Sequence, residues 1–302
     1  MRFLIAGSSG FLGTRLRERL TSAGHDVSAL VRRPPSPGHA PHDVQWDPYT
    51  APLGPEVVDN HDVVVNLGGS PVAGNPHSRK WAEKLEKSRV TTTRVLAEAI
   101  AASETKPVFL ASNAVAFYGD HGDDTLDEHA DSRSDSVMAR VTRAWQAATE
   151  PAVAAGSRVV VLRTAPVYDR RSQPLGALRL QFEAGLGGRL GDGHQYVPII
   201  STRDWVDAVL HLAETPTLSG PVNVCCERVP TNAELTAELA HQVHRPAVLH
   251  VPAFVLRRAA GALAPEVLNS VRTHPAALLD SGFRFSDPDV RAVLREGLAP
   301  SR

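Results

Sequence analysis

The stretch Arg2–Leu20, RFLIAGSSGFLGTRLRERL, combines a short apolar run, three spaced glycines and an amphipathic helix pattern. RFLIA is typical of a buried strand, and Leu12, Leu16 and Leu20 fall on one face of a helix. A tight turn needs glycine, a nearby pyrophosphate excludes a β-carbon, and a helix N-terminus offers N–H groups. The stretch therefore predicts a dinucleotide-binding strand–loop–helix unit. Its expected cofactor residues are Gly7, Ser9, Gly10, Phe11, Leu12 and Gly13.

The same alternation of strands and helices continues through the first two-thirds of the chain. Further apolar strand patterns occupy residues 26–31, 43–46, 62–67, 107–112 and 158–164, and helical patterns occupy 78–103 and 136–155. Continuous apolar strands separated by helices are typical of a parallel sheet covered on both faces. The sequence therefore predicts an α/β fold: a Rossmann-like doubly wound parallel sheet with a smaller C-terminal substrate-binding region.

The regular alternation of strand and helix patterns ends after Tyr168, where a glycine-rich, irregular stretch begins. We expect the dinucleotide-binding domain to cover residues 1–169 plus parts of 197–225. Residues 170–196 and 226–302 then form the smaller helical region, placed across the carboxyl edge of the sheet, where ligands bind in open α/β folds.

Composition narrows the classes of ligand. The net charge is -1 with no block of like charges, which argues against a nucleic-acid partner and favours a small molecule. No stretch approaches the length of a membrane span, so a cytoplasmic protein without a membrane partner is expected. Adjacent Cys225 and Cys226 suit neither a disulfide nor a zinc site, and no metal is expected.

The ends of two further strands predict which cofactor binds. The second strand ends in Arg32 and Arg33 rather than in an acidic residue. Arginine pairs with a ribose 2′-phosphate, so NADP is favoured over NAD, although both side chains could instead be solvated surface groups. The fourth strand ends in NLGGS, and the backbone of Leu67, Gly68 and Gly69 is expected to pass close to the cofactor. Trp46 and Asp47 either border the adenine or serve only as a structural pair.

The ordered motifs of the chain resemble a known family. They are GSSGFLG, VNLGGSPVAG, SRVTTTRVL, NAVAFYG, VVVLRTAPV, GLGGRLGDGHQ, GPVNVCCERVPTNAEL, RPAVLHVPAF and LLDSGFRFSDPDV. The chain resembles the extended short-chain dehydrogenase/reductase superfamily, in its atypical branch of NAD(P)-dependent epimerase family proteins with a helical C-terminal extension. The resemblance implies a bound nicotinamide cofactor and a substrate region built from the C-terminal part. It says little about the substrate.

The chain departs from that superfamily where proton transfer is expected. A catalytic serine or threonine and a Tyr-x-x-x-Lys pair are usual there, but Asn113 stands at the serine position. By register against Trp145, Met138 and Thr142 stand at the tyrosine and lysine positions, and neither titrates usefully. Pro166, in TAPVY, replaces a glycine-hydrophobic segment and would stiffen a loop that faces the nicotinamide.

Several polar side chains remain as candidates near the nicotinamide. Asn113 is expected to contact substrate as a hydrogen-bond donor, and Tyr118 to be either a proton donor or part of the cleft wall. Ser112, Arg163 and Pro166 are expected at the cofactor, with an edge ion pair as the alternative for Arg163.

Three other polar residues have weaker claims. His194 is a titrating candidate that could equally be a solvated loop histidine, and Ser88 and Arg89 are expected to anchor their helix.

Two functions fit this set of residues. One is an NADP-binding oxidoreductase-like enzyme with a small-molecule substrate, acting as a monomer or homodimer. The alternative is a non-redox lyase, isomerase or cyclase, or a nicotinamide-nucleotide-responsive binding protein, that keeps the nucleotide pocket.

Overall fold

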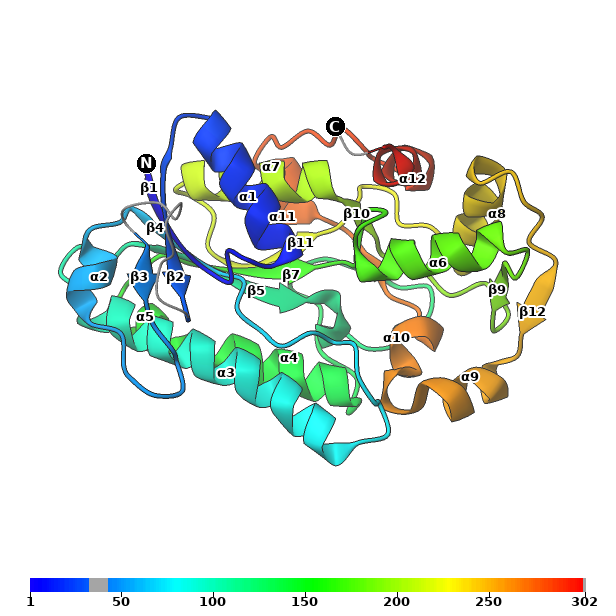
Figure 1. Cartoon of the computed structure of the whole chain (residues 1–302), viewed down its shortest axis with the longest axis horizontal. Helices are drawn as coiled ribbons and strands as arrows, with labels where there is room; N and C mark the ends of the chain where they lie inside the picture. Colours follow the sequence, from blue (N-terminus) through cyan, green and yellow to red (C-terminus); the bar gives the residue numbers. More distant parts are fainter. Residues whose placement is uncertain (33–42, 301–302) are drawn as a thin grey trace. The chain divides into compact units, whose positions relative to one another are not determined.

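A parallel sheet flanked by helices organises the chain (Figure 1). The computed structural model describes residues 1–32 and 43–300. Within those residues a seven-stranded sheet has the order β11-β7-β5-β4-β1-β2-β3. The non-consecutive neighbours are typical of a doubly wound sheet, and the Rossmann-like α/β fold predicted from the sequence is confirmed.

The chain divides into two compact units. The first comprises Met1–Asn113, Val141–Leu162 and Val209–Pro221, and the second comprises Ala114–Arg140, Arg163–Ala208 and Val222–Arg302. The two interleave along the sequence. The domain boundaries expected from the sequence stay a prediction.

The first unit carries most of the sheet. Its strands are β1 (Arg2–Ala6), β2 (Asp26–Val31), β3 (Val44–Gln45), β4 (Val63–Asn66), β5 (Val108–Ala114) and β7 (Val159–Thr164), of which β5 and β7 end in the second unit. Its helices are α1 (Phe11–Ser22), α2 (Pro55–Asp59), α3 (Arg79–Ala102) and α5 (Glu150–Ala154). Three further elements contain a boundary between units: α4 (Val137–Ala147), α7 (Thr202–Glu214) and β11 (Gly220–Val224).

Strand register places the ends of neighbouring strands side by side. β1 pairs in parallel with β2 and β4, and β4 pairs in parallel with β5. Ala6 is opposite Asn66, and Asn66 is opposite Ala111. Because all these strands run the same way, Gly7 and Leu67 leave the sheet at one edge, its carboxyl edge, and Ser112 follows Ala111 near the same end of β5.

Apolar side chains fill both faces of this sheet. Leu4, Val64 and Phe109 from three adjacent strands pack with Leu96 and Ile100 of α3 in one buried cluster. In Figure 1, α1 and α3 lie on opposite sides of the strands β1 and β4. The continuous apolar strands predicted this two-sided burial.

The second unit has short strands and many helices. Its strands are β6 (Thr125–Leu126), β8 (Val167–Tyr168), β9 (Gly188–Leu190), β10 (Ile200–Ser201), β12 (Leu249–Val251) and β13 (Arg272–Thr273). Its helices are η1 (Val115–Phe117), α6 (Gln173–Glu183), α8 (Asn232–Gln242), α9 (Ala253–Ala260), η2 (Gly261–Leu263), α10 (Pro265–Leu268), α11 (Ala276–Asp280) and α12 (Val290–Leu298). Leu175, Phe182, Leu235 and Val293 form its core with their neighbours.

The helix predicted over residues 136–155 is wrong in one respect, because the chain forms two helices there. α4 ends at Ala147, and α5 begins at Glu150 with Pro151 in its first turn. Proline has no N–H for a bond to the preceding turn, and its ring crowds the carbonyl four residues earlier. The chain therefore restarts at Glu150.

Two expectations from the sequence concern the cysteines and membrane-spanning helices. Cys225 and Cys226 are buried and free, as expected. Among the described residues, helices lack the length and apolar character needed to cross a bilayer.

Candidate functional site

The glycine loop after β1 leaves no room for side chains at two of its positions. Gly7 has a φ of +83°, and a β-carbon there would lie 2.7 Å from the backbone carbon and oxygen of Leu67. A β-carbon on Gly13 would lie 2.3 Å from the carbonyl oxygen of Gly7. The Gly10 N–H closes the turn on that same oxygen at 3.1 Å. At these two glycines the helix, the loop and the end of β4 therefore approach one another through backbone atoms.

This loop fits the pyrophosphate of a dinucleotide. Helix α1 starts directly after Gly10, with no side-chain cap from any described residue and no acidic residue in its first turn. Ser9 and Gly10 are exposed, while Phe11 and Leu12 are half-buried. A helix N-terminus without a carboxylate and with exposed backbone before it favours an anionic group. The loop is thus shaped as the sequence predicts.

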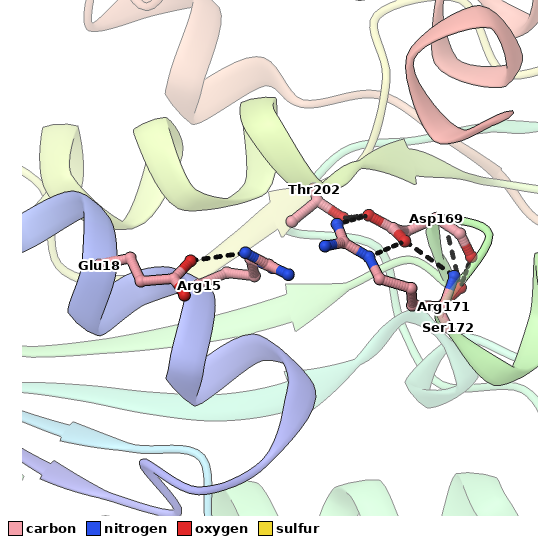
Figure 2. Close-up of polar contacts among 6 residues, drawn as sticks. All are labelled: Arg15, Glu18, Asp169, Arg171, Ser172 and Thr202. Carbon is pink, nitrogen blue, oxygen red and sulfur yellow. Dashed lines mark hydrogen bonds and ion pairs between the residues drawn. The ribbon is translucent and has the colours of Figure 1, made fainter. Parts of the chain in front are cut away.

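The positive end of helix α1 is not neutralised by the acidic residue further along it. Arg15 pairs with Glu18 at 2.6 Å, one turn into the helix (Figure 2). The Glu18 carboxylate is thereby matched by a cation on the same helix. Its pairing leaves the N-terminal turn available for a phosphate.

Arg32 lies beside a pocket at the end of β2. The pocket has a volume of about 340 Å³ and is lined by Arg32, Trp46, Asp47 and Leu53, among others. Trp46 is buried, and its indole N–H donates to the Ala51 carbonyl at 3.2 Å. Arg32 is exposed, while Arg33 lies outside the described residues. Trp46 and Asp47, named from the sequence as possible adenine neighbours, do border this pocket.

The NLGGS segment is held by hydrogen bonds from α3. Asn66 donates to Thr93 Oγ1 at 2.8 Å and accepts from the Gly68 N–H at 2.9 Å. Ser88 Oγ accepts from the Ser70 N–H at 2.9 Å. These bonds fix the backbone of Leu67, Gly68 and Gly69 beside the phosphate loop. Gly69 is exposed and Leu67 and Gly68 are half-buried, as a cofactor-facing segment requires.

Asn113 is buried at the end of β5. Its side-chain amide donates to the Thr142 carbonyl of α4 at 3.0 Å, whereas the preceding Ser112 is half-buried. Thr142 stands at the position where a lysine is usual in the superfamily, and its side chain is fully buried. The amide of Asn113 is therefore oriented by the helix that would otherwise carry the Tyr-x-x-x-Lys pair.

Tyr118 is fully buried, and its hydroxyl is held within the second unit. It donates to Oδ1 of Asn223 at 2.7 Å and accepts from Nη1 of Arg163 at 2.9 Å. Burial raises the pKa of Tyr118 to about 12, with Arg163 and the hydrogen bond to Asn223 opposing the rise. A phenol with so high a pKa is a weak proton donor at neutral pH. The geometry favours a structural Tyr118.

Arg163 is also buried, in contact with aromatic rings. Its guanidinium carbon lies 3.7 Å from the centre of the Phe117 ring, and Nη1 donates to the Glu128 carbonyl at 3.1 Å. Nearby, Pro166 is exposed, and its carbonyl accepts from the Ile200 N–H at 3.2 Å. The contacts of Arg163 favour a structural role.

The polar centre around Tyr118 includes two residues that sequence reasoning missed. Oε1 of Glu128 accepts from the N–H groups of Asn223 and Ala277, and Asn223 donates to the carbonyls of Leu126 and His274. The residue pattern could not find them, because Glu128 and Asn223 are 95 positions apart. The one hint in the sequence was the run PVNV, in which Asn223 is a polar residue inside an apolar strand.

A second polar group orders the loop after β8. Asp169 forms an ion pair with Arg171 at 2.6 Å and accepts from Thr202 Oγ1 at 3.5 Å, while Ser172 donates to its carbonyl at 2.7 Å (Figure 2). His194, the sequence candidate in the following glycine-rich loop, is exposed. Its backbone N–H donates to Oδ1 of Asp192 at 2.9 Å. The residues around Asp169 support the start of α6.

Comparison with known proteins gives two family matches. Residues 3–225 match the family described as NAD dependent epimerase/dehydratase. Residues 251–296 match a domain of unknown function, DUF1731. Together they span the parts of the chain that carry the glycine loop and the C-terminal helices.

Three similar proteins cover nearly the whole chain. Epimerase family protein Mb2239 of Mycobacterium bovis is 38% identical over 299 residues, which are 99% of this chain and 97% of the relative. The crystal structure of human epimerase family protein SDR39U1 with NADPH is 28% identical, with a TM-score of 0.86 and coverage of 98% and 99%. The nucleoside-diphosphate sugar epimerase from Corynebacterium glutamicum is 33% identical, with a TM-score of 0.80, and covers 99% of this chain and 58% of its own.

Proposed function

Because this chain belongs to the NAD dependent epimerase/dehydratase family, we propose that it is an NADP-binding oxidoreductase-like enzyme that acts on a small molecule. The observation that carries the proposal is the pair of glycines at which no β-carbon fits, Gly7 and Gly13. A backbone-lined loop at a helix N-terminus is the shape that a pyrophosphate requires. The extended short-chain dehydrogenase/reductase class follows from the motifs and the fold.

The residues that would hold the cofactor belong to the first unit. The Gly7–Gly13 loop and the start of α1 would bind the pyrophosphate, and the backbone of Leu67–Gly69 would pass beside the second ribose. When bound, a nicotinamide dinucleotide supplies a hydride donor or acceptor. The chain itself contributes orientation, charge and the exclusion of water.

NADP is favoured over NAD by charge at the end of β2. Arg32 is exposed beside the pocket that Trp46 lines, and acidic residues are absent from the end of the described strand at Val31–Arg32. A guanidinium matches a phosphate monoester and has no match in a ribose hydroxyl pair. The NADPH in the human relative's crystal structure supports the same preference.

The residues on the substrate side of the site differ from those of an ordinary short-chain reductase. Met138 and Thr142 occupy one face of α4, four residues apart and both buried, where a tyrosine and a lysine are usual. We assign substrate contact to Asn113, whose amide polarises a carbonyl without titrating. The substrate is then a small molecule that binds beside the fixed amide of Asn113. The chain acts as a monomer or homodimer.

A non-redox function is the second candidate, and buried Met138 and Thr142 are what favours it. Without a titrating pair, the same pocket could serve a lyase, isomerase or cyclase, or bind the nucleotide as a signal. The two candidates differ in whether NADPH absorbance changes on turnover.

The test is an absorbance assay at the nicotinamide band with NADPH and a panel of aldehydes and ketones. Consumption of NADPH with any carbonyl substrate supports the oxidoreductase, and Asn113→Ala should then reduce kcat by about 100-fold, the loss typical of a removed oxyanion donor. Tight NADPH binding without turnover of any carbonyl compound in the panel would contradict the oxidoreductase and favour the non-redox candidate.

A further inference from the structure

Arg89 of α3 is a buried cation beside the glycine pair that ends β4. The residue is 8% exposed. A β-carbon built on Gly69 would lie 3.4 Å from its guanidinium carbon and 3.5 Å from Nη1. On its other side the guanidinium carbon is 5.2 Å from the centre of the Trp145 ring. The side chain therefore has an aromatic ring near it and an exposed backbone segment beside it.

Arg89 has no acidic partner in the part of the chain that the structure describes. Its hydrogen bond runs from Nη1 to the Leu85 carbonyl at 3.2 Å, one turn earlier in the same helix. Residues 33–42, outside the described part, contain neither Asp nor Glu. Burial lowers the pKa of Arg89 to about 10. Buried arginines are ordinarily paired, so this charge calls for an anion from outside the chain.

The surroundings of Arg89 connect it to both parts of the predicted cofactor site. Gly69 follows Gly68, whose backbone nitrogen would be 2.9 Å from a β-carbon on Gly7 of the phosphate loop. The charge of Arg89 also acts on Tyr49. Burial raises the pKa of Tyr49, and the charges of Arg32 and then Arg89 oppose the rise. Arg89 thus lies along Gly69, next to the loop assigned to the diphosphate, and its charge acts on a tyrosine that Arg32 also affects.

We propose that Arg89 binds the diphosphate of the nicotinamide dinucleotide and is the counter-charge of that group. This inference rests on the proposed nucleotide-binding function and adds a side-chain cation to a loop otherwise made of backbone donors. A diphosphate presents oxygens in the geometry that a planar guanidinium fits. Because NADPH and NADH share the diphosphate, Arg89 sets the affinity for both, whereas Arg32 separates the two.

A purely structural role for Arg89 predicts a different effect of its substitution. If the residue only packed on Trp145 and bonded Leu85, its replacement would lower the stability of the unliganded protein and leave nucleotide affinity intact. If it is a ligand-binding cation without an acidic partner among the described residues, its removal relieves a buried charge that no carboxylate neutralises. Thermal unfolding without ligand and calorimetric titration with ligand therefore separate the two roles.

The experiment compares Arg89→Gln with wild type, using NADPH and NADH as probes. We expect both affinities to fall by the same factor, about 10- to 100-fold, the range of a lost charge-assisted hydrogen bond. The unliganded Tm should be unchanged or higher. Lys84→Gln, which removes an exposed cation of the same helix, should leave both affinities within about twofold, as for other surface substitutions. Arg32→Ala should weaken NADPH alone.

Two outcomes would overturn the proposal. Loss of NADPH affinity alone would move Arg89 to the 2′-phosphate, and unchanged affinities with a lowered Tm would make it structural. If Arg89→Gln fails to fold, Arg89→Lys takes its place, because it keeps the positive charge. A loss of binding affinity of more than 100-fold for only one of the two nucleotides would then reject the diphosphate contact. Failure of the proposed function itself looks different, because then wild type binds neither nucleotide.

Discussion

The Tyr118 hydroxyl donates a 2.7 Å hydrogen bond to Oδ1 of Asn223, inside a polar centre that Arg163 and Glu128 complete. The tyrosine that most resembles a catalytic acid in the sequence is thus held by buried protein groups. Its hydroxyl satisfies an amide oxygen that would otherwise be left without this donor. The hydroxyl therefore has a structural use that needs no lysine to lower its pKa.

Tyr118→Phe should therefore affect stability more than cofactor binding. Removing the hydroxyl leaves Asn223 and Arg163 short of a buried partner, and the free energy of unfolding should fall by about 1 to 3 kcal/mol. Urea denaturation measures the loss. NADPH affinity, measured by titration, should stay within about twofold of wild type.

The matched control is Tyr168→Phe, at a second buried tyrosine, whose hydroxyl makes no hydrogen bond found among the described residues. It should cost less than Tyr118→Phe. An unchanged stability of Tyr118→Phe together with loss of turnover would instead identify Tyr118 as a proton donor.

Gly7→Ala tests whether the loop needs glycine for space as well as for backbone conformation. Gly24 provides the comparison, because its φ of +81° matches the +83° of Gly7 while no atom lies within 4 Å of its would-be β-carbon. Gly24→Ala should cost about 1 to 2 kcal/mol, the strain of the left-handed region. Gly7→Ala should cost more and should also abolish NADPH binding, as followed by calorimetry. Equal losses of stability with retained binding would show that the contact with Leu67 is unimportant.

Arg32→Ala should change which nucleotide is preferred. NADPH affinity should fall by about 10- to 100-fold, since one charge-assisted contact to the 2′-phosphate is lost. NADH, which has a hydroxyl there, should bind as before. Titration of each nucleotide against both proteins gives the ratio, and an equal loss for the two would remove the case for a 2′-phosphate contact.

Asp204 makes stability depend on pH in a direction that can be stated in advance. The residue is 1% exposed, and burial raises its pKa from 3.8 to about 6, while hydrogen bonds from the backbone of Ser286 and Asp287 oppose the rise. The folded protein therefore holds this proton more tightly than the unfolded chain does. The contribution is fully present below about pH 4 and is lost as the pH rises through about 6, a change of up to about 3 kcal/mol.

The comparison of wild type with Asp204→Asn isolates that contribution, because the substitution removes this carboxyl group and nearly keeps the shape of the side chain. The unfolding free energy of wild type minus that of the variant should decrease between pH 4 and pH 7. Urea denaturation at steps across this range measures it. A difference that does not vary with pH would show that Asp204 keeps an ordinary pKa.

The local patterns near the N-terminus predicted the fold well because each rests on neighbouring residues. Gly7, Gly10 and Gly13 lie within seven positions, and the apolar runs of β1 and β4 needed no partner to be read as buried strands. The break at Pro151 was missed because the apolar period continued across it. Asn223 and Glu128 were missed because their contact joins distant segments, and no spacing encodes such a contact.

The role proposed for Arg89 could not be predicted from the sequence for a related reason. In the sequence it is one more arginine of an amphipathic helix, and anchoring the helix was the natural expectation. Only the structure shows that the side chain lies along Gly69 and on Trp145 without an acidic partner among the described residues. Burial of a charge is a property of the packed chain.

Calorimetric titration of the purified wild-type protein with NADPH and with NADH tests the central claim most directly. We predict that both bind at a single site and that NADPH binds at least about tenfold more tightly, as one added charge-assisted contact implies. Absence of binding by either nucleotide at millimolar concentration would contradict the assignment of the glycine loop, and with it the proposed function.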